Sequence, residues 1–264
     1  MPESEAVLYE VIDHIAVITL NRPDNRNSMT EDILSGIEKR VMQVRADHDL
    51  RCVIITGKGN CFCAGADFKT GATRDIPGRE LQPNEKSFAM YQPFLSVLDI
   101  EVPVIGALNG HAIGGGLGLT LVCDIRVANQ DAKYGANFTK LGLHPGMATT
   151  YFLPRFIGVP RAAELLLTGR IITGAEAADY GLMNYALPES EVWVKSWELA
   201  QEVASCAPLA NRWTKRSLYQ NCDWNPVEAA LHEAELQSRT IATEDYAEGT
   251  SALLEKRTPN FHGK

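Results

Sequence analysis

The sequence contains no apolar run of the ~18 residues that a membrane-spanning helix needs. Positive charge is in the minority among its 264 residues: the net charge is −8 and the pI about 5.3, which argues against nucleic acid as the main partner. Residues 1–5 are acidic and polar, unlike a signal peptide or an Arg-rich transit peptide. We therefore expect a cytoplasmic protein without a nucleic-acid or membrane partner.

Cysteine is infrequent and scattered, at Cys52, Cys61, Cys63, Cys123, Cys206 and Cys222. A chain of this length can hold its core without disulfides, so we expect reduced thiols. Only Cys61 and Cys63 lie close in sequence, and the lack of a second ligand pair argues against zinc. The glycine run at 114–116 also lacks the acidic residue that follows in dinucleotide sites. We therefore expect no metal and no bound cofactor.

Short apolar runs alternate with helical periodicities over residues 1–187. Residues 7–12 and 15–20 predict two strands of a hairpin around Asp13 and His14. Further apolar runs predict buried strands at residues 52–56, 102–108 and 124–128. Ser28 begins a segment that fits a capping box and precedes apolar residues at helical spacing. This alternation predicts an α/β fold with a partly parallel sheet.

The sequence pattern changes at two further places along the chain. Residues 69–86 are rich in glycine, proline and charge, which predicts a loop before a helix that ends near Leu98. From residue 188 onward only helical patterns occur, at residues 192–206, 209–219, 227–241 and 246–254. We therefore expect an α/β core over residues 1–187 and a separate helical subdomain over residues 188–264.

Two segments share one order of features: a buried strand, then small residues, then a helix start. The first leads from residues 53–57 to Ala64, Gly65 and Ala66, and the second leads from residues 104–108 to the glycine cluster. Small residues let a backbone N–H approach a ligand closely, and a helix start aims unpaired N–H groups at an oxygen. Each segment alone is explained by a tight turn, but the two together predict an oxyanion hole.

The residues of these loops carry a family resemblance. Cys-Ala-Gly-Ala-Asp-Phe at 63–68 and Asn-Gly-His-Ala-Ile-Gly-Gly-Gly-Leu-Gly-Leu at 109–119, followed by Cys-Asp-Ile-Arg at 123–126, resemble the signature loops of the crotonase superfamily, the enoyl-CoA hydratase/isomerase family. The resemblance covers nearly the whole chain, through the ending that contains Phe261. It implies a crotonase-like spiral of repeated ββα units, an acyl-CoA thioester substrate from fatty acid metabolism, and coenzyme A only as part of that substrate.

The same resemblance implies roles for particular residues. The oxyanion donors map to the backbone N–H groups of Ala66 and Gly115. The coenzyme A contact region maps to Arg26, Ser28, Ala64, Asp67, Phe68 and Lys69, and the adenosine end to Phe261 and Lys264, often of a neighbouring subunit. The family commonly forms homotrimers or dimers of trimers (hexamers), so residues 188–264 are expected to support oligomerisation and cover the active site.

The sequence departs from the hydratase pattern at its acid–base positions. Hydratases of the family carry two glutamates, at the positions of Gly118 and Phe138 here, and neither residue can transfer a proton. Phe138 is therefore expected only to contact substrate. Some isomerases place an acid in the next turn, where Gly146 stands in or next to its place. The resemblance thus predicts the binding cradle without its usual acid and base.

Other side chains are candidates for the missing chemistry. His144, next to the expected acid position, is the leading candidate for proton transfer, and its alternative is a surface or supporting histidine. We expect His111 to act mainly through its backbone and Asp67 to cap a helix if it does not contact coenzyme A. Asp124 and Arg126 predict a buried structural ion pair. The loop acids, which are expected to be solvated, are Asp75, Glu80 and Glu85.

Three functions remain open on these residues. The leading one is a lyase or isomerase of the enoyl-CoA hydratase/isomerase family that acts on an acyl-CoA through a thioester enolate. The second is a non-catalytic acyl-CoA-binding protein. The third is a carbon–carbon hydrolase or lyase of the same fold, acting on a diketone or a β-oxygenated substrate.

Overall fold

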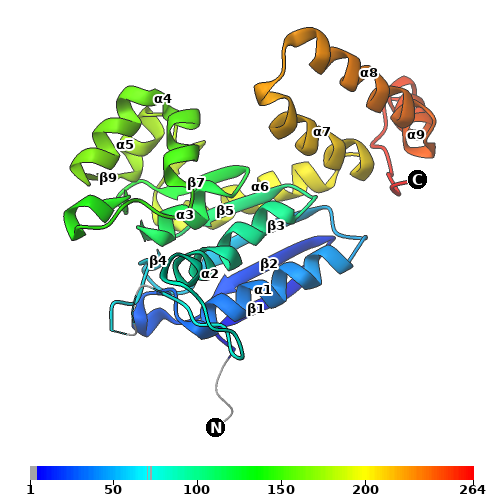
Figure 1. Ribbon diagram of the computed structural model, residues 1–264. Coiled ribbons are helices and arrows are strands. Elements are labelled where there is room, and N and C mark those ends of the chain that lie inside the picture. The colour runs from blue at the N-terminus through cyan, green and yellow to red at the C-terminus, as the bar shows by residue number, and fades with distance from the viewer. Residues whose placement is uncertain (1–4, 70, 72) are drawn as a thin grey trace.

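The computed structural model describes residues 5–69, 71 and 73–264, and its core holds two β-sheets (Figure 1). The large sheet has the strand order β1-β2-β3-β5-β7-β10, with bounds Val7–Ile12, Ile15–Leu20, Cys52–Gly57, Val104–Leu108, Ile125–Asn129 and Tyr185–Leu187. The small sheet has the order β4-β6-β8-β9, with bounds Cys61–Cys63, His111–Ile113, Lys133–Gly135 and Ile171–Thr173. The α/β prediction is confirmed.

The helices follow the strands in a repeating order. The α-helices are α1 Glu31–Ala46, α2 Pro83–Leu95, α3 Gly115–Leu121, α4 Thr149–Thr168, α5 Gly174–Asp179, α6 Glu189–Ala204, α7 Pro208–Gln220, α8 Pro226–Ile241 and α9 Glu244–Glu255. Three times the chain places a strand in the large sheet, the next in the small sheet, and then forms a helix: β3-β4-α2, β5-β6-α3 and β7-β8-α4. This repetition is the predicted ββα spiral.

The large sheet begins with a hairpin and continues in parallel. Strands β1 and β2 pair antiparallel around Asp13 and His14, whose φ angles of 48° and 66° suit a tight turn between twisted strands. From β2 onward, β3, β5, β7 and β10 pair parallel. Because helices cover both faces of parallel strands, β3 is apolar at successive positions, and Val53, Ile54 and Ile55 are all fully buried.

Alternate strand residues separate the core into two clusters. Val53 and Ile55 face the larger cluster, together with residues of α1 and α3. Ile54 faces the smaller cluster, where it meets Val192 and Ala200 of α6. Helix α6, the first helix of the predicted C-terminal subdomain, therefore packs directly on the large sheet.

Helices α7, α8 and α9 extend away from the sheets, at the upper right of Figure 1. Asp124 anchors α7 to the core, because its carboxylate accepts from Tyr219 Oη at 2.6 Å and from the Val104 N–H at 2.6 Å and lies 2.8 Å from Lys215 Nζ. The predicted ion pair between Asp124 and Arg126 is therefore wrong. Arg126 instead donates to backbone carbonyls and lies 4.5 Å from the centre of the Phe156 ring.

The start of α1 and the end of α2 differ from what the sequence predicted. The predicted capping box at Ser28 is wrong: α1 begins at Glu31 after Thr30, and Ser28 Oγ instead donates to the Asn25 carbonyl at 2.7 Å. The helix expected to end near Leu98 continues from α2 into a 3₁₀ turn, Ser96–Asp99. In the described part of the chain, no helix combines the length and the hydropathy needed to cross a membrane.

Candidate functional site

The two small-residue loops touch each other at the end of the spiral. A Cβ added to Gly65 would lie 2.5 Å from the Ile113 carbonyl oxygen and 3.1 Å from the Gly115 nitrogen. Gly65 has a φ of 86°, which also favours glycine. Gly115 is the first residue of α3, so its N–H has no partner within the helix. The loops that carry the Ala66 and Gly115 N–H groups are therefore in van der Waals contact.

A segment near the N-terminus lies along the first loop. The Ala64 N–H donates to the Arg26 carbonyl at 3.0 Å, the Met29 N–H donates to the Gly65 carbonyl at 2.8 Å, and Met29 forms a parallel bridge with Ala66. The structure thus brings Arg26 and its neighbour Ser28 beside the first loop. Arg26 is exposed, so its guanidinium is accessible to an anion.

Asn27 holds this segment in place, a role that the sequence analysis missed. The side chain is fully buried, and its Nδ2 donates to the carbonyls of Cys61 at 2.8 Å and Lys58 at 3.1 Å. Its Oδ1 accepts from the Arg22 N–H at 2.8 Å, and its φ is 53°. Asparagine tolerates this left-handed backbone better than most residues, which is the signal that could have marked the position.

Residues 67–69 continue the first loop toward solvent. Asp67 Oδ1 accepts from the Lys69 N–H at 3.0 Å, and no helix begins here, so the alternative role of Asp67 as a helix cap is wrong. Lys69 is exposed and Phe68 is 61% exposed, which is unusual for a large apolar side chain. These side chains lie on the same loop as Ala64 and Ala66 and are available to a ligand at its rim.

The C-terminal residues expected near the adenosine lie elsewhere in the same chain. The Phe261 ring lies against Gly249 of α9, and the Lys264 carbonyl accepts from the Asp245 N–H at 3.1 Å. Figure 1 shows the C-terminus far from β4 and α3. The structure therefore does not bring Phe261 and Lys264 to the loops of their own chain.

Apolar side chains lie at Gly118 and Phe138, the two positions that are expected to carry glutamates in a hydratase. A Cβ added to Gly118 would lie 2.4 Å from Met147 Cβ, so methionine occupies the room that a glutamate would need. Phe138 is half-buried, and its ring tip lies 3.9 Å from the Cβ position of Gly114 in the second loop. Neither residue has a side chain that can transfer a proton, and the apolar groups at these positions are the Met147 side chain and the Phe138 ring.

The turn at Gly146 meets a polar group that the sequence analysis did not single out. A Cβ added to Gly146 would lie 2.6 Å from the Tyr91 hydroxyl oxygen, on α2. Burial raises the pKa of Tyr91 above its ordinary value. Tyr91 and Gly146 are far apart in sequence, so no local pattern could have paired them.

His144 lies on the same turn, with an exposed ring. Its Nδ1 is 2.8 Å from the Pro145 carbonyl oxygen. Since a carbonyl only accepts, Nδ1 carries the hydrogen when this bond forms, and Nε2 of the neutral ring then has a lone pair. His111, by comparison, accepts from the Lys133 N–H at 2.9 Å beside the small sheet.

The loop acids have structural surroundings. Glu85 accepts from the Gln82 N–H at 2.8 Å as part of the capping box of α2. Asp75 lies 2.7 Å from Lys86 Nζ, and Glu80 is exposed. None of the three carboxylates has a contact with Ala66 or Gly115 in the described part of the chain.

The thiols nearest to the two loops, Cys61 and Cys63, are buried. Burial raises the pKa of Cys61 to about 11 and that of Cys63 to about 12, so both thiols stay protonated at neutral pH. Cys61 Sγ also donates to the His111 carbonyl at 3.2 Å. Among the residues that the structure describes, no cluster of three or more His, Cys, Asp and Glu side chains could hold a metal ion.

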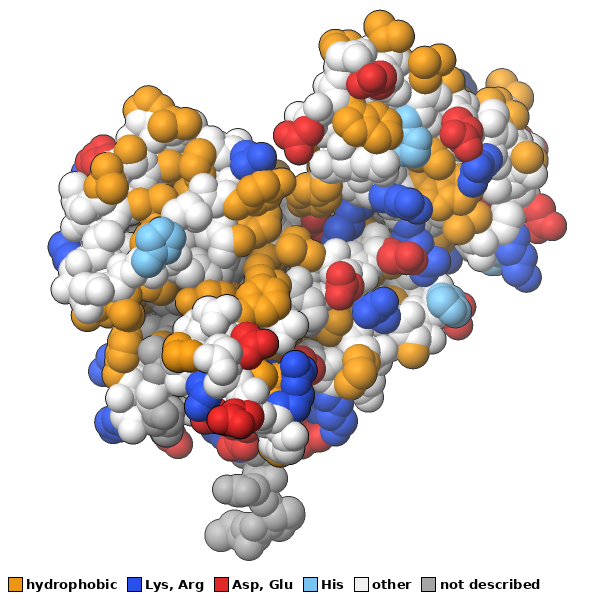
Figure 2. Space-filling view, in the orientation of Figure 1, with side chains coloured by type: hydrophobic (Ala, Val, Ile, Leu, Met, Phe, Trp, Pro, Cys, Tyr) orange, Lys and Arg blue, Asp and Glu red, His pale blue; other side chains and the backbone are white. Residues whose placement is uncertain are grey.

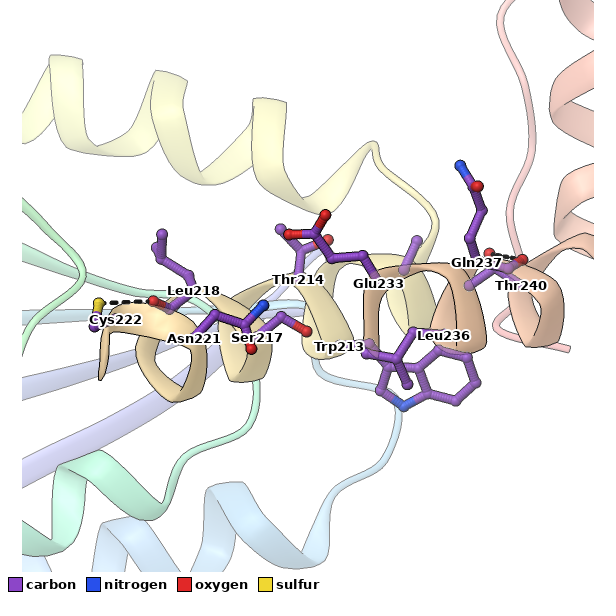
Figure 3. A pocket seen from close by; sticks show the side chains of 11 residues that line it. Trp213, Thr214, Ser217, Leu218, Asn221, Cys222, Glu233, Leu236, Gln237 and Thr240 are labelled. Atoms are coloured by element: carbon purple, nitrogen blue, oxygen red, sulfur yellow. Dashed lines mark hydrogen bonds between the residues drawn. The ribbon is translucent and has the colours of Figure 1, made fainter. Parts of the chain in front are cut away.

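A separate groove of about 560 Å³ lies between α7 and α8 (Figure 3). Trp213 and Leu236 form an apolar part of its lining, and Glu233 and Asn221 contribute polar groups. These residues come from the helices that extend away from the sheets, so the groove is distinct from the two loops.

Comparison with known proteins decides the family. The model of the family described as "Enoyl-CoA hydratase/isomerase" matches residues 10–264. This chain belongs to that family. As a member of the enoyl-CoA hydratase/isomerase family it is an enzyme with the crotonase fold, and the match spans both signature loops and the C-terminal helices.

Relatives within the enoyl-CoA hydratase/isomerase family match over nearly their full lengths. YngF of Bacillus subtilis, named as a candidate enoyl-CoA hydratase/isomerase, is 36% identical over 98% of this chain and 99% of its own. (E)-benzylidenesuccinyl-CoA hydratase of Thauera aromatica is 35% identical over 97% and 99%. The crystal structure of enoyl-CoA hydratase from Bacillus anthracis has a TM-score of 0.90 at 34% identity, covering 98% of this chain and 100% of that chain.

Proposed function

We propose that this enzyme binds an acyl-CoA thioester and stabilises its enolate between the backbone N–H groups of Ala66 and Gly115. The observation that carries the proposal is the contact between the two loops, in which Gly65 leaves room for the Ile113 carbonyl and the Gly115 nitrogen. A preorganised donor of this kind stabilises developing negative charge by ~3–4 kcal/mol. Coenzyme A enters as part of the substrate, and the chemistry needs no metal.

The coenzyme A portion is proposed to lie along Arg26, Ser28 and the first loop. Support comes from the backbone contacts that hold Arg26 beside Ala64, and from the exposed Lys69 at the rim. Cationic side chains bind phosphate well when a rigid backbone presents them. The Phe261 and Lys264 contacts are proposed to come from a neighbouring subunit, since the two residues lie far from the loops of their own chain.

His144 is proposed to take the proton at C2 of the acyl group. When Nδ1 donates to the Pro145 carbonyl, the neutral ring is the tautomer whose Nε2 can accept a proton. His144 lies on the same turn as Met147, which touches α3 at Gly118. A proton leaving C2 next to a thioester oxygen held by two N–H groups gives an enolate, which is the intermediate shared by isomerases and lyases of this kind.

Calorimetric titration with coenzyme A and with crotonyl-CoA tests the binding part of the proposal. We expect saturable binding and a raised melting temperature, since a ligand at 100 times its Kd stabilises the folded state by ~2.7 kcal/mol. Lys69→Gln should weaken binding and Lys39→Gln, an exposed change on α1, should leave it unaltered. Absence of heat and of a thermal shift at millimolar ligand would contradict the proposal.

A further inference from the structure

Three side chains occupy the space around α3 and the turn that faces it. Met147 fills the room at Gly118, the Phe138 ring closes the approach to Gly114, and Tyr91 fills the room at Gly146. The methionine and the phenylalanine have no exchangeable proton, whereas the tyrosine hydroxyl has one.

The fit between Tyr91 and Gly146 is close enough to depend on the glycine. The hydroxyl oxygen lies 2.6 Å and Cζ 2.7 Å from the position that a Cβ at 146 would take, and real Cβ contacts are not this short. The φ of Gly146 is not among the positive values, so the glycine is required here for space and not for backbone conformation. Position 146 is thus open because a hydroxyl from α2 enters it.

The surroundings of Tyr91 keep its hydroxyl neutral and available. The residue is half-buried and packs against the main core cluster, and burial raises the pKa of its hydroxyl with no charged neighbour contributing. At neutral pH the group therefore keeps its proton. In the described part of the chain the Tyr91 hydroxyl makes no hydrogen bond, so its donor capacity remains for a ligand.

We propose that Tyr91 is the proton donor of the site and that the reaction is a proton shift along the acyl chain. This inference rests on the proposed enolate function and narrows it to an isomerisation. The division of roles follows from two groups at the turn that contains residues 144–146: His144 offers a lone pair at Nε2, and Tyr91 of α2 offers a proton beside Gly146.

The proposed shift from a 3-enoyl to a 2-enoyl thioester balances in atoms and electrons. The C2–H bond breaks, its proton goes to His144 Nε2, and its electron pair moves onto the thioester oxygen held by the loop N–H groups. The oxygen pair then restores the C1=O bond, the C1–C2 π pair of the enolate becomes the C2–C3 double bond, and the former C3–C4 π pair forms a new C4–H bond with the Tyr91 proton. Water then reprotonates the phenolate and takes the proton from the imidazolium.

The test uses 3-butenoyl-CoA in D2O, followed by proton NMR. One sample reports two events: exchange of the C2 protons and appearance of crotonyl-CoA. For the unmodified protein we expect both. Tyr91→Phe keeps the ring and removes only the donor, so formation of crotonyl-CoA should fall ~100- to 10,000-fold while C2 exchange and the Kd for coenzyme A stay unchanged. Tyr185→Phe, at the far edge strand β10, should behave as the unmodified protein.

His144→Gln should lose both NMR events, because no base then removes the C2 proton. If Tyr91→Phe forms crotonyl-CoA as fast as the unmodified protein does, Tyr91 is not the donor. If Tyr91→Phe binds coenzyme A but no longer exchanges the C2 protons, the donor role is overturned as well. C2 exchange without any crotonyl-CoA from the unmodified protein overturns this inference alone and leaves the enolate proposal intact. A protein that shows neither event and does not bind coenzyme A overturns both.

Discussion

At the scale of single residues, side-chain packing occupies the positions where the resemblance places the glutamates of a hydratase. Glycine at 118 is required by the Met147 side chain, whose Cβ, Cγ and Cε all lie within 3.2 Å of the place where a Cβ would be. Position 138 carries a ring at the place of a carboxylate. The packing at Gly118 therefore leaves no room for a longer side chain unless Met147 moves.

We expect crotonyl-CoA to be hydrated at a rate near background, and Gly118→Glu not to restore hydration. The new side chain would collide with Met147, which should lower the free energy of unfolding by ~1–3 kcal/mol. Urea unfolding and a hydration assay measure the two effects. Met147→Gly in the Gly118→Glu background should recover part of the stability, because it removes all three contacting carbons and glycine suits the φ of 58° at position 147. A stable Gly118→Glu variant with brisk hydration would show that this packing is not what blocks the chemistry.

The sequence could predict which residues are absent from the site more readily than which residues replace them. Gly118, Phe138 and Gly146 stand out because motifs surround them. Tyr91 lies in a helix without a motif, and only the folded chain brings its hydroxyl to Gly146. The placement of His144 in the turn was predictable, whereas the Nδ1 contact with the Pro145 carbonyl was not, because it depends on the turn's backbone.

At the scale of elements, long apolar strands were predictable and short strands were not. Residues 7–12 and 15–20 match β1 and β2 to the residue, since six-residue alternating or buried runs give a clear signal. The strands of the small sheet have three residues each, too few for a period to show. The family resemblance therefore implied the ββα repeat, but the residue bounds of these short strands came only from the structure.

The C-terminal helices were predictable as helices but not in how they are held. Helices α6 to α9 match the four predicted segments within a few residues at each end. Their attachment depends on contacts between distant residues, such as Asp124 with Lys215 and Tyr219. Sequence reasoning instead paired Asp124 with its neighbour Arg126, because proximity along the chain was the only guide.

Breaking the attachment of α7 should cost more than breaking a surface pair. The side chains of Asp124 and Lys215 are 13% and 12% exposed, so Lys215→Met leaves a nearly buried carboxylate without its cation. We expect the free energy of unfolding to fall by roughly 3 kcal/mol. Arg239→Met removes the exposed partner of Glu235, both of whose side chains are 58% exposed, and should cost at most ~1 kcal/mol. Equal losses in urea unfolding would show that the Asp124 cluster does not anchor α7.

At the scale of the whole molecule, the C-terminal helices present apolar surface to solvent. Figure 2 shows hydrophobic side chains along the recess between these helices and the rest of the molecule and on the outer helices. The large exposed apolar residues on α8 and α9 include Val227, Leu231, Leu253 and Leu254, the last 79% exposed. Large apolar side chains gathered on exposed helices mark an interaction site more often than an unoccupied surface.

We propose that a second copy of the chain covers this surface, in a homotrimer or a dimer of trimers. Light scattering at micromolar concentration should give three or six times the mass of the chain. Leu253→Glu combined with Leu254→Glu should reduce the assembly to smaller species, because it places charge in the contact. Met42→Glu, at an exposed position of α1, should leave the assembly intact. A monomeric unmodified protein would contradict the assembly.

The exchange of C2 protons in a saturated acyl-CoA tests directly whether the protein stabilises a thioester enolate. Butyryl-CoA has no double bond to shift or hydrate, so its C2 protons exchange with D2O only through the enolate. We expect the protein to accelerate this exchange, and we expect Gly115→Pro, which deletes one donor N–H, to abolish the acceleration. Butyryl-CoA that binds to the protein and keeps its C2 protons at the uncatalysed rate would contradict the account.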